Sequence, residues 1–119
     1  STMGGDVYVY VLDDTTNEWL EVFLLLELGD QDSFGHAVSV NGEYILVGAW
    51  NGFGKAYIYT RETDTDWFLT TTYYGPNGNV TYHAGRSVAM GTDKALVSLD
   101  GDREEAGSVL VFEKSEDWP

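Results

Sequence analysis

The sequence contains the stretch Gly5-Asp6-Val7-Tyr8-Val9-Tyr10, which returns as Gly54-Lys55-Ala56-Tyr57-Ile58-Tyr59 and again as Gly107-Ser108-Val109-Leu110-Val111-Phe112. Each occurrence is followed by an acidic turn and then by a tryptophan, namely Trp19, Trp67 and Trp118. The tryptophans lie about fifty residues apart, an interval that suits a supersecondary unit repeated along the chain.

A second element repeats at the same interval. The alignment pairs Phe34-Gly35-His36-Ala37-Val38-Ser39-Val40 with Ala84-Gly85-Arg86-Ser87-Val88-Ala89-Met90, and apolar runs follow at 44–49 and 94–99. A period near fifty residues that holds several short strands is typical of a propeller or a similar array. The sequence therefore predicts an all-β fold, a β-propeller segment.

Alternating apolar residues and the turn residues between them predict short strands and no helix. Asn41-Gly42 separates two of these strands and predicts a tight hairpin, because both residues tolerate a positive φ. The strand near residues 7–11 is apolar at both alternating sets of positions, so both of its faces are expected to be covered. The expected strands span 5–12, 19–28, 34–40, 44–49, 54–60, 67–74, 84–90, 94–99 and 107–113.

Two of the expected strands, 34–40 and 84–90, carry small residues at every second position. Small side chains fit where backbones approach closely, as on the innermost strands of a propeller. We expect neighbouring backbone to crowd these positions, which are Gly35, Ala37 and Ser39 in the first strand and Gly85, Ser87 and Ala89 in the second.

Nearly the whole chain resembles the FG-GAP repeats that build the β-propeller of integrin α-subunit heads and of many secreted or surface proteins. The resemblance rests on Asp32-Ser33-Phe34-Gly35-His36-Ala37-Val38, Ile45-Leu46-Val47-Gly48-Ala49 and Gly54-Lys55-Ala56-Tyr57-Ile58-Tyr59. The second repeat departs from the pattern at Ala84-Gly85 and at Val97-Ser98-Leu99. The resemblance implies four-stranded antiparallel blades with strand 34–40 innermost, and a location outside the cell or at its surface.

The resemblance makes residues 1–119 a single propeller segment with an incomplete ring. Residues 34–74 are the expected complete blade, 5–28 the outer strands of a preceding blade, and 84–113 a partial blade. Propellers need about four to eight blades to close a ring. We expect the ring to be completed either by further blades of the same propeller or by another protein chain.

The resemblance implies a non-catalytic protein-interaction, scaffold or adhesion module. Enzymatic patterns are sparse, because His36 and His83 lie in no nucleophile elbow and in no zinc-ligand spacing. The alternative is an accessory or catalytic propeller domain of a carbohydrate-active hydrolase, although no spacing singles out a pair of carboxylates for glycoside hydrolysis.

The composition restricts the partners. With 6 Lys and Arg against 20 Asp and Glu, the formal net charge is −14, which disfavours nucleic acid and anionic membranes because both attract clustered cations. No apolar run approaches the ~20 residues of a membrane span, and no cysteine is present. Acidic turns at 13–18, 62–66 and 114–117 are expected on one rim, where they either favour solubility or attract a cationic partner.

Calcium-binding FG-GAP repeats carry an Asp-x-Asp-x-Asp-Gly loop between the first two strands of a blade, and residues 40–43 and 90–93 lack it. Alternate acidic residues that converge on a hard cation leave two weaker calcium candidates, and no other cofactor is expected. These candidates are Asp30 with Asp32, and Asp100 with Asp102 and Glu104.

The opposite rim holds the candidate partner-binding residues. Trp50 and Phe53 flank Asn51-Gly52 and either stack on a sugar or protein or cover the blade below them. His83, in a nearby loop, is a further candidate. Asn79-Val80-Thr81 is a glycosylation sequon, which either is used in a secretory pathway or arises by chance.

Overall fold

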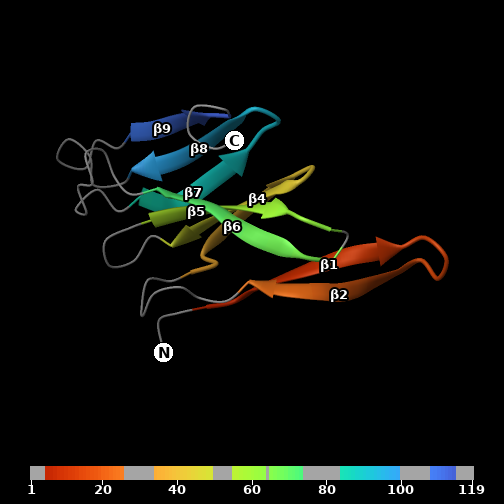
Figure 1. Ribbon diagram of the computed structural model, residues 1–119. Coiled ribbons are helices and arrows are strands. Elements are labelled where there is room, and N and C mark those ends of the chain that lie inside the picture. Colours follow the sequence, from red (N-terminus) through yellow and green to blue (C-terminus); the bar gives the residue numbers. More distant parts are fainter. Residues whose placement is uncertain are drawn as a thin grey trace.

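The computed structural model describes residues 5–25, 34–49, 55–63, 65–73, 84–99 and 108–114, and these ranges contain strands and turns but no helix (Figure 1). The strands form three antiparallel sheets: an N-terminal hairpin β1-β2, a central sheet β3-β4-β5-β6 and a C-terminal sheet β7-β8-β9. The all-β prediction is confirmed. The bounds are β1 Val7–Asp13, β2 Glu18–Leu25, β3 Ala37–Asn41, β4 Tyr44–Ala49, β5 Lys55–Arg61, β6 Trp67–Tyr73, β7 Ala84–Met90, β8 Lys94–Leu99 and β9 Ser108–Glu113.

The turn between β3 and β4 differs from its prediction. Asn41 remains in the strand and lies opposite Tyr44, so the turn consists of Gly42 and Glu43. Of Asn41, Gly42 and Glu43, only Gly42 has a positive φ, of 60°. A glycine at the first turn position suits a hairpin that needs one positive φ rather than two.

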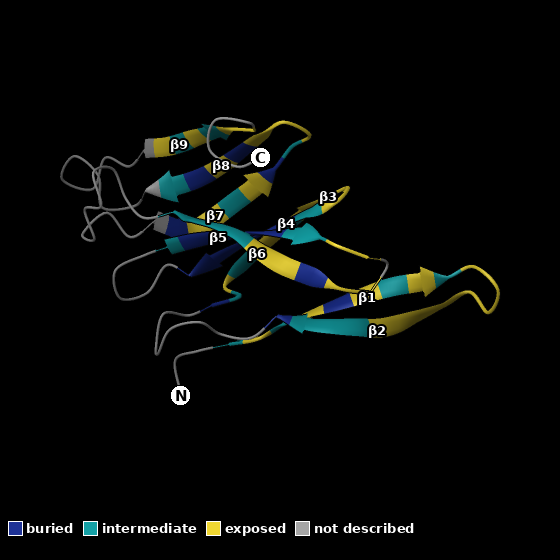
Figure 2. Cartoon of the chain, viewed as in Figure 1, coloured by how far each residue is buried: buried dark blue, intermediate teal, exposed yellow. Residues whose placement is uncertain are grey.

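The middle strands of the central sheet, β4 and β5, are buried on both faces (Figure 2). A hydrophobic core forms on each face because β4 and β5 are apolar at both alternating sets of positions. Full burial of one large apolar side chain contributes about 1.5–3 kcal/mol to stability. The core toward the N-terminal hairpin contains Val9, Leu25, Phe34, Ile45, Val47, Ala49, Tyr57, Tyr59 and Trp67. The core toward the C-terminal sheet contains Leu46, Ala56, Ile58, Met90, Ala95 and Val97.

The described residues cover only one face of the N-terminal hairpin. Val9 is buried against the central sheet, whereas Tyr8 and Tyr10 on the opposite face are each 51% exposed. The prediction that both faces of this strand are covered is therefore wrong for β1. An apolar pattern marks two faces suited to burial, but burial itself requires a second layer of structure.

The central and C-terminal sheets share one register. Val38 lies opposite Val47 in the β3-β4 pair, and Val88 lies opposite Val97 in the β7-β8 pair. The predicted equivalence of strands 34–40 and 84–90 is therefore confirmed over the residues that pair in both sheets.

One backbone hydrogen bond also recurs at the same end of both sheets. The Arg61 N–H donates to the Glu43 carbonyl oxygen at 2.8 Å, and the Lys114 N–H donates to the Asp93 carbonyl oxygen at 2.9 Å. Each bond ties the residue at the end of the third strand of its sheet to the turn between the first two.

The N-terminal hairpin β1-β2 repeats the strand pair β5-β6 of the central sheet. Each pair contains a β-bulge at the same place. A bulge adds one residue to one strand and leaves the register shifted beyond it. The bulge lies between the pairs Val9–Phe23 and Tyr10–Glu21 in the hairpin, and between the pairs Ile58–Thr71 and Tyr59–Leu69 in the central sheet.

The repeated tryptophans occupy matching positions in these two strand pairs. Trp19 lies opposite Leu12 and Trp67 lies opposite Arg61, at the turn end of each pair. Their predicted equivalence is confirmed, and Trp118 lies outside the described residues. The two differ in burial: Trp67 packs in the core against the hairpin, whereas Trp19 is exposed.

Two glycines confirm the predicted crowding. Gly35 has a φ of 89°, and a Cβ there would lie 3.3 Å from the Asp6 carbonyl oxygen. Gly85 has a φ of 100°, and a Cβ there would strike the Lys55 carbonyl oxygen. Asp6 and Lys55 themselves correspond in the repeated stretch that precedes each tryptophan, so each glycine approaches the preceding sheet at the same point.

The crowding prediction is wrong for the other small residues of the second strand. Ser87 and Ala89 are exposed on the outer face of the C-terminal sheet. Within the described ranges no strand packs on that face, so a small side chain there is not required by close packing.

A hydrogen bond between two sheets gives a first testable expectation. The Met90 N–H donates to Ser39 Oγ at 2.8 Å across the contact between β7 and β3. Ser39→Ala leaves this half-buried donor without its acceptor, so the free energy of unfolding should fall by about 1–3 kcal/mol in urea titrations. Ser98→Ala is the matched control, because its Oγ accepts from the exposed Ser87 N–H, which water can satisfy instead. Equal losses in the two variants would contradict the expectation.

Candidate functional site

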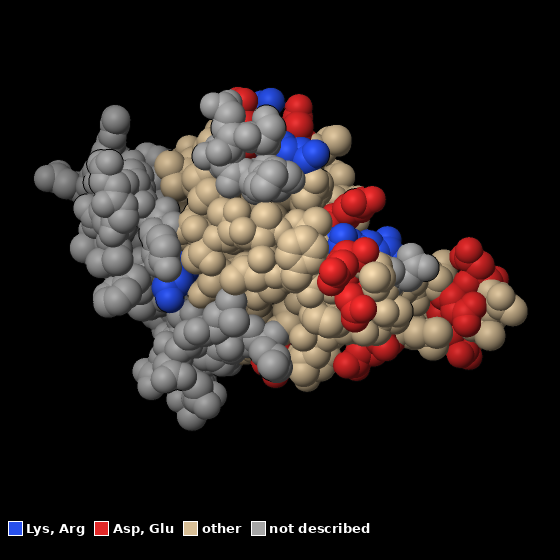
Figure 3. Space-filling model, in the orientation of Figure 1, with Lys and Arg blue, Asp and Glu red and all other residues tan. Residues whose placement is uncertain are grey.

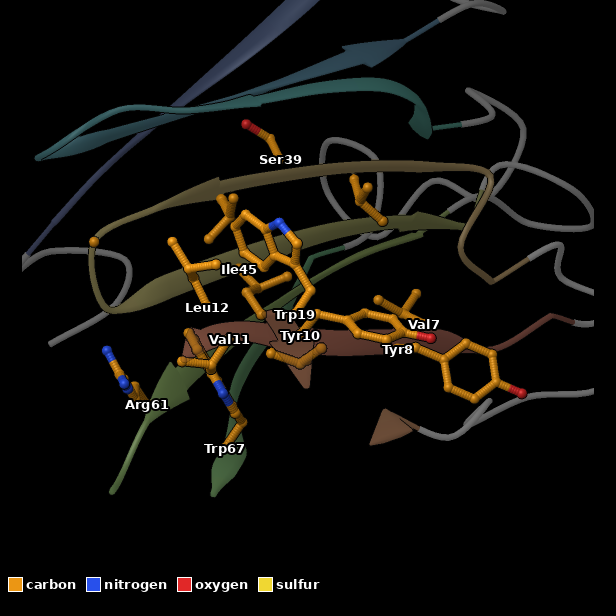
Figure 4. A pocket seen from close by; sticks show the side chains of 14 residues that line it. Val7, Tyr8, Tyr10, Val11, Leu12, Trp19, Ser39, Ile45, Arg61 and Trp67 are labelled. Atoms are coloured by element: carbon orange, nitrogen blue, oxygen red, sulfur yellow. The ribbon is translucent and has the colours of Figure 1, made fainter. Parts of the chain in front are cut away.

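A groove of about 560 Å³ opens between the N-terminal hairpin and the central sheet. Figure 4 shows β1 on one side and β3 with β4 on the other, with Leu12, Trp19 and Ile45 between them. Its walls come from two segments far apart in sequence. The lining residues are Val7, Tyr8, Val9, Tyr10, Val11, Leu12 and Trp19 on the hairpin, and Val38, Ser39, Val40, Gly42, Ile45, Arg61 and Trp67 on the central sheet.

The groove follows the open edge of β1. Consecutive residues of β1, pointing to both faces of the hairpin, line it, so it runs beside the strand rather than over one face. Within the described residues β1 pairs only with β2. The other edge of such a strand presents alternate backbone N–H and C=O groups, which form a template for one more strand.

The walls of the groove are mostly apolar. Among the described residues that line it, Arg61 is the one with a charged side chain, and the Arg61 Nε donates to the Thr63 carbonyl oxygen at 3.2 Å. Val9, Ile45 and Trp67 line the groove and also belong to the core between the hairpin and the central sheet. The groove is thus a continuation of that core to the surface.

The indole nitrogen of Trp67 adds an unmet hydrogen bond beside the groove. The nitrogen is buried and has no partner among the described residues. A buried donor of this kind costs about 1–3 kcal/mol. The packing of the ring on the hairpin must therefore outweigh this cost.

The exposure of β3 in the groove contrasts with the equivalent strand of the next sheet. Val40 is 66% exposed, whereas Met90, at the corresponding position of β7, is 7% exposed. Met90 is buried because β7 lies against β3 and β4 of the central sheet. No described strand lies against β3 in the same way on its opposite face, so Val38 and Val40 face the groove.

A second, shallower hollow of about 180 Å³ lies on the outer face of the C-terminal sheet. Its lining is small or aliphatic, so it offers an apolar surface with few polar groups. The lining residues are Ser87, Val88, Ala89, Leu96, Ser98 and Val109.

Acidic side chains gather at the end of the molecule that carries the β1-β2 and β5-β6 turns (Figure 3). Two of them stabilise these turns: the Asp13 carboxylate accepts from the Thr15 N–H at 2.8 Å, and the Asp66 carboxylate accepts from the Thr63 hydroxyl at 3.1 Å. A role in turn formation therefore accounts for part of the acidic pattern. Recognition of a cationic partner by this rim stays a prediction.

The site residues predicted from the sequence lie outside the described residues. They are the calcium candidates Asp30, Asp32, Asp100, Asp102 and Glu104, the partner-binding candidates Trp50, Phe53 and His83, and the sequon residue Asn79. In the described ranges no three His, Cys, Asp or Glu residues are grouped to hold a metal ion. His36 and Arg86, aligned in the repeat, are both exposed.

The groove itself is not evident from the sequence. The signal on β1 was present, since its residues are apolar at both sets of positions. The contribution of β3 was not visible, because its alternation does not say which structure lies opposite Val38 and Val40.

No protein-family model matches the sequence, and no curated protein is significantly similar to it. Among the described residues, no helix is long and apolar enough to cross a membrane.

Proposed function

We propose that the chain is a segment of an FG-GAP-like β-propeller and serves as a non-catalytic protein-interaction or scaffold module, outside the cell or at its surface. The observation that carries this proposal is the stacking of three antiparallel sheets, in which the middle strands of the central sheet are buried on both faces. A two-sheet sandwich buries only the inner face of each sheet. Blades arranged around an axis instead bury each sheet between two neighbours.

The recurring contacts support the same proposal. The shared β3-β4 and β7-β8 register, the shared bulge and the paired approaches of Gly35 and Gly85 relate successive sheets by one repeated packing. In repeat proteins each unit is stabilised mainly by its neighbours. A scaffold of this kind grows by adding units and presents their outer faces to partners.

The exposed apolar surface supports an interaction role. Tyr8 and Tyr10 are half exposed on the outer face of the hairpin, and Val109 and Val111 are exposed on the C-terminal sheet. Large apolar surfaces that face water mark sites of association. The N-terminal hairpin and the C-terminal sheet therefore each offer a face for another polypeptide.

Sedimentation velocity of the isolated chain tests the proposal. At ~0.15 M salt, where charges are screened beyond about 8 Å, we expect concentration-dependent association through the apolar faces. The net charge of −14 opposes contact between chains, so dilution into low salt should shift the population toward the monomer.

A stable monomer at every salt concentration, with well-dispersed amide resonances, would contradict the proposed association. Aggregation without a defined stoichiometry would also count against it, because an ordered scaffold buries specific faces.

A further inference from the structure

We propose that the groove beside β1 is the docking site for one added β-hairpin, whose second strand pairs antiparallel with the open edge of β1. The inference rests on the proposed function, because it takes the repeated sheet as the pattern for the occupant. The occupant is a strand pair of the β3-β4 type, and it covers Val38 and Val40.

The strand pair β1-β2 is equivalent to the strand pair β5-β6. Both pairs carry the same bulge and place Trp19 or Trp67 at the same end. On its other edge β5 is paired with β4, which in turn pairs with β3. The groove lies at the corresponding place beside β1, where no described strand pairs. A hairpin like β3-β4 is therefore the element that completes the repeated pattern.

The wall of the groove opposite β1 is exposed. Met90 is buried between β7 and the central sheet, while Val40 at the equivalent position of β3 faces the groove. A hairpin beside β1 would extend the N-terminal hairpin into a sheet that lies against β3. The occupant thus gives Val40 the cover that Met90 already has.

The groove is continuous with the existing core. Val9, Ile45 and Trp67 belong both to the groove and to the core between the hairpin and the central sheet. An added strand therefore extends an interface that the chain has already formed. Its side chains toward the groove must be apolar, because a charge buried there without a partner is costly.

The structure also specifies a small residue in the occupant. A Cβ on Gly48 of β4 would strike the Gly85 carbonyl oxygen, so the second strand of a repeat makes room for the glycine of the next sheet. Gly35 is the counterpart of Gly85 and already approaches Asp6. The occupant should therefore carry glycine at the position that corresponds to Gly48.

A synthetic peptide with the sequence of residues 34–49 is the probe. Added to the full chain, it should slow hydrogen exchange at β1 amides and leave the exchange of β6 and β9 amides unchanged. The same peptide with Gly48→Val is its control and should bind at least about tenfold more weakly, because the added side chain meets backbone.

Two variants of the full chain locate the binding. Val40→Asp places a charge in the groove and should weaken peptide binding at least about tenfold. Val109→Asp is the matched control, because Val109 is 60% exposed on the C-terminal sheet and does not line the groove. It should leave the affinity unchanged, and thermal melts of both variants establish that they remain folded.

A fusion tests the same docking within one molecule, which removes the entropic cost of bringing two molecules together. A second copy of residues 34–53 is placed directly before Gly5, as residues 34–53 precede Gly54 in the natural order. A short connection raises the effective concentration to about the millimolar range. The fusion should protect β1 amides from exchange and raise Tm, and Gly48→Val in the added copy should abolish both effects.

Unprotected β1 amides in the fusion would overturn the inference, as would equal weakening by Val40→Asp and Val109→Asp. If β1 stays unprotected but the chain self-associates in an ordered way in sedimentation, the groove proposal is wrong and the proposed interaction module is retained. A monomeric chain whose fusion protects β1 would instead remove the proposed self-association and keep the groove as a hairpin site.

Discussion

Gly85→Ala is expected to destabilise the chain by about 3 kcal/mol or more. Two costs add: the new Cβ would strike the Lys55 carbonyl oxygen and lie 3.0 Å from the Ala49 nitrogen, and the φ of 100° disfavours any side chain. Backbone atoms of the central sheet form the obstacle, so a change of rotamer does not relieve it. Urea titrations followed by tryptophan fluorescence measure the loss.

Gly42→Ala is the matched control for Gly85→Ala. Gly42 also has a positive φ, of 60°, but a Cβ there would meet nothing within 4 Å. Its cost should be about 1–2 kcal/mol, from backbone conformation alone. If both variants lost the same stability, the close approach of Gly85 to the central sheet would be wrong.

Phe34→Ala is expected to cost about 3–5 kcal/mol, because it removes a large side chain from the core that joins the N-terminal hairpin to the central sheet. Phe34 is 2% exposed, and its ring centroid lies 5.4 Å from that of Tyr57 and 6.4 Å from that of Tyr59. Thermal and urea unfolding should both register the loss.

Phe68→Ala is the control for this cavity, because Phe68 is 46% exposed on β6. Its effect should stay within about 0.5–1 kcal/mol. A loss for Phe34→Ala no larger than this would mean that the hairpin does not pack on the central sheet.

The sheets were predictable because their signals are local. Alternation and the repeated stretch predict β5 and its equivalents β1 and β9. The glycine at position 35 indicates that neighbouring backbone approaches the chain closely there. The exact turn at Gly42 was missed, since the choice between one and two positive φ values depends on how the flanking strands pair.

The groove was not predictable, because it depends on the faces that the sheets turn toward one another. Residues at the same repeat position, such as Val40 and Met90, have similar apolar character and opposite exposure. Sequence pattern indicates what a residue tolerates, whereas its surroundings decide whether it is covered. The predicted calcium and partner-binding residues lie outside the described ranges, so they remain predictions.

The meander order of the sheets has a consequence for how the chain acquires its structure. Every described strand pair joins neighbours in sequence, so each sheet needs only local loop closures, whereas contacts between sheets join more distant segments. Short closures are the fast steps of β-sheet folding, and the slower steps are contacts between distant segments. The packing of Gly85 on Lys55 joins two sheets, so we expect it to form after the strand pairs within each sheet. During synthesis from the N-terminus the strands of the hairpin would emerge first, then those of the central sheet and then those of the C-terminal sheet, so each sheet could pack on the one before it.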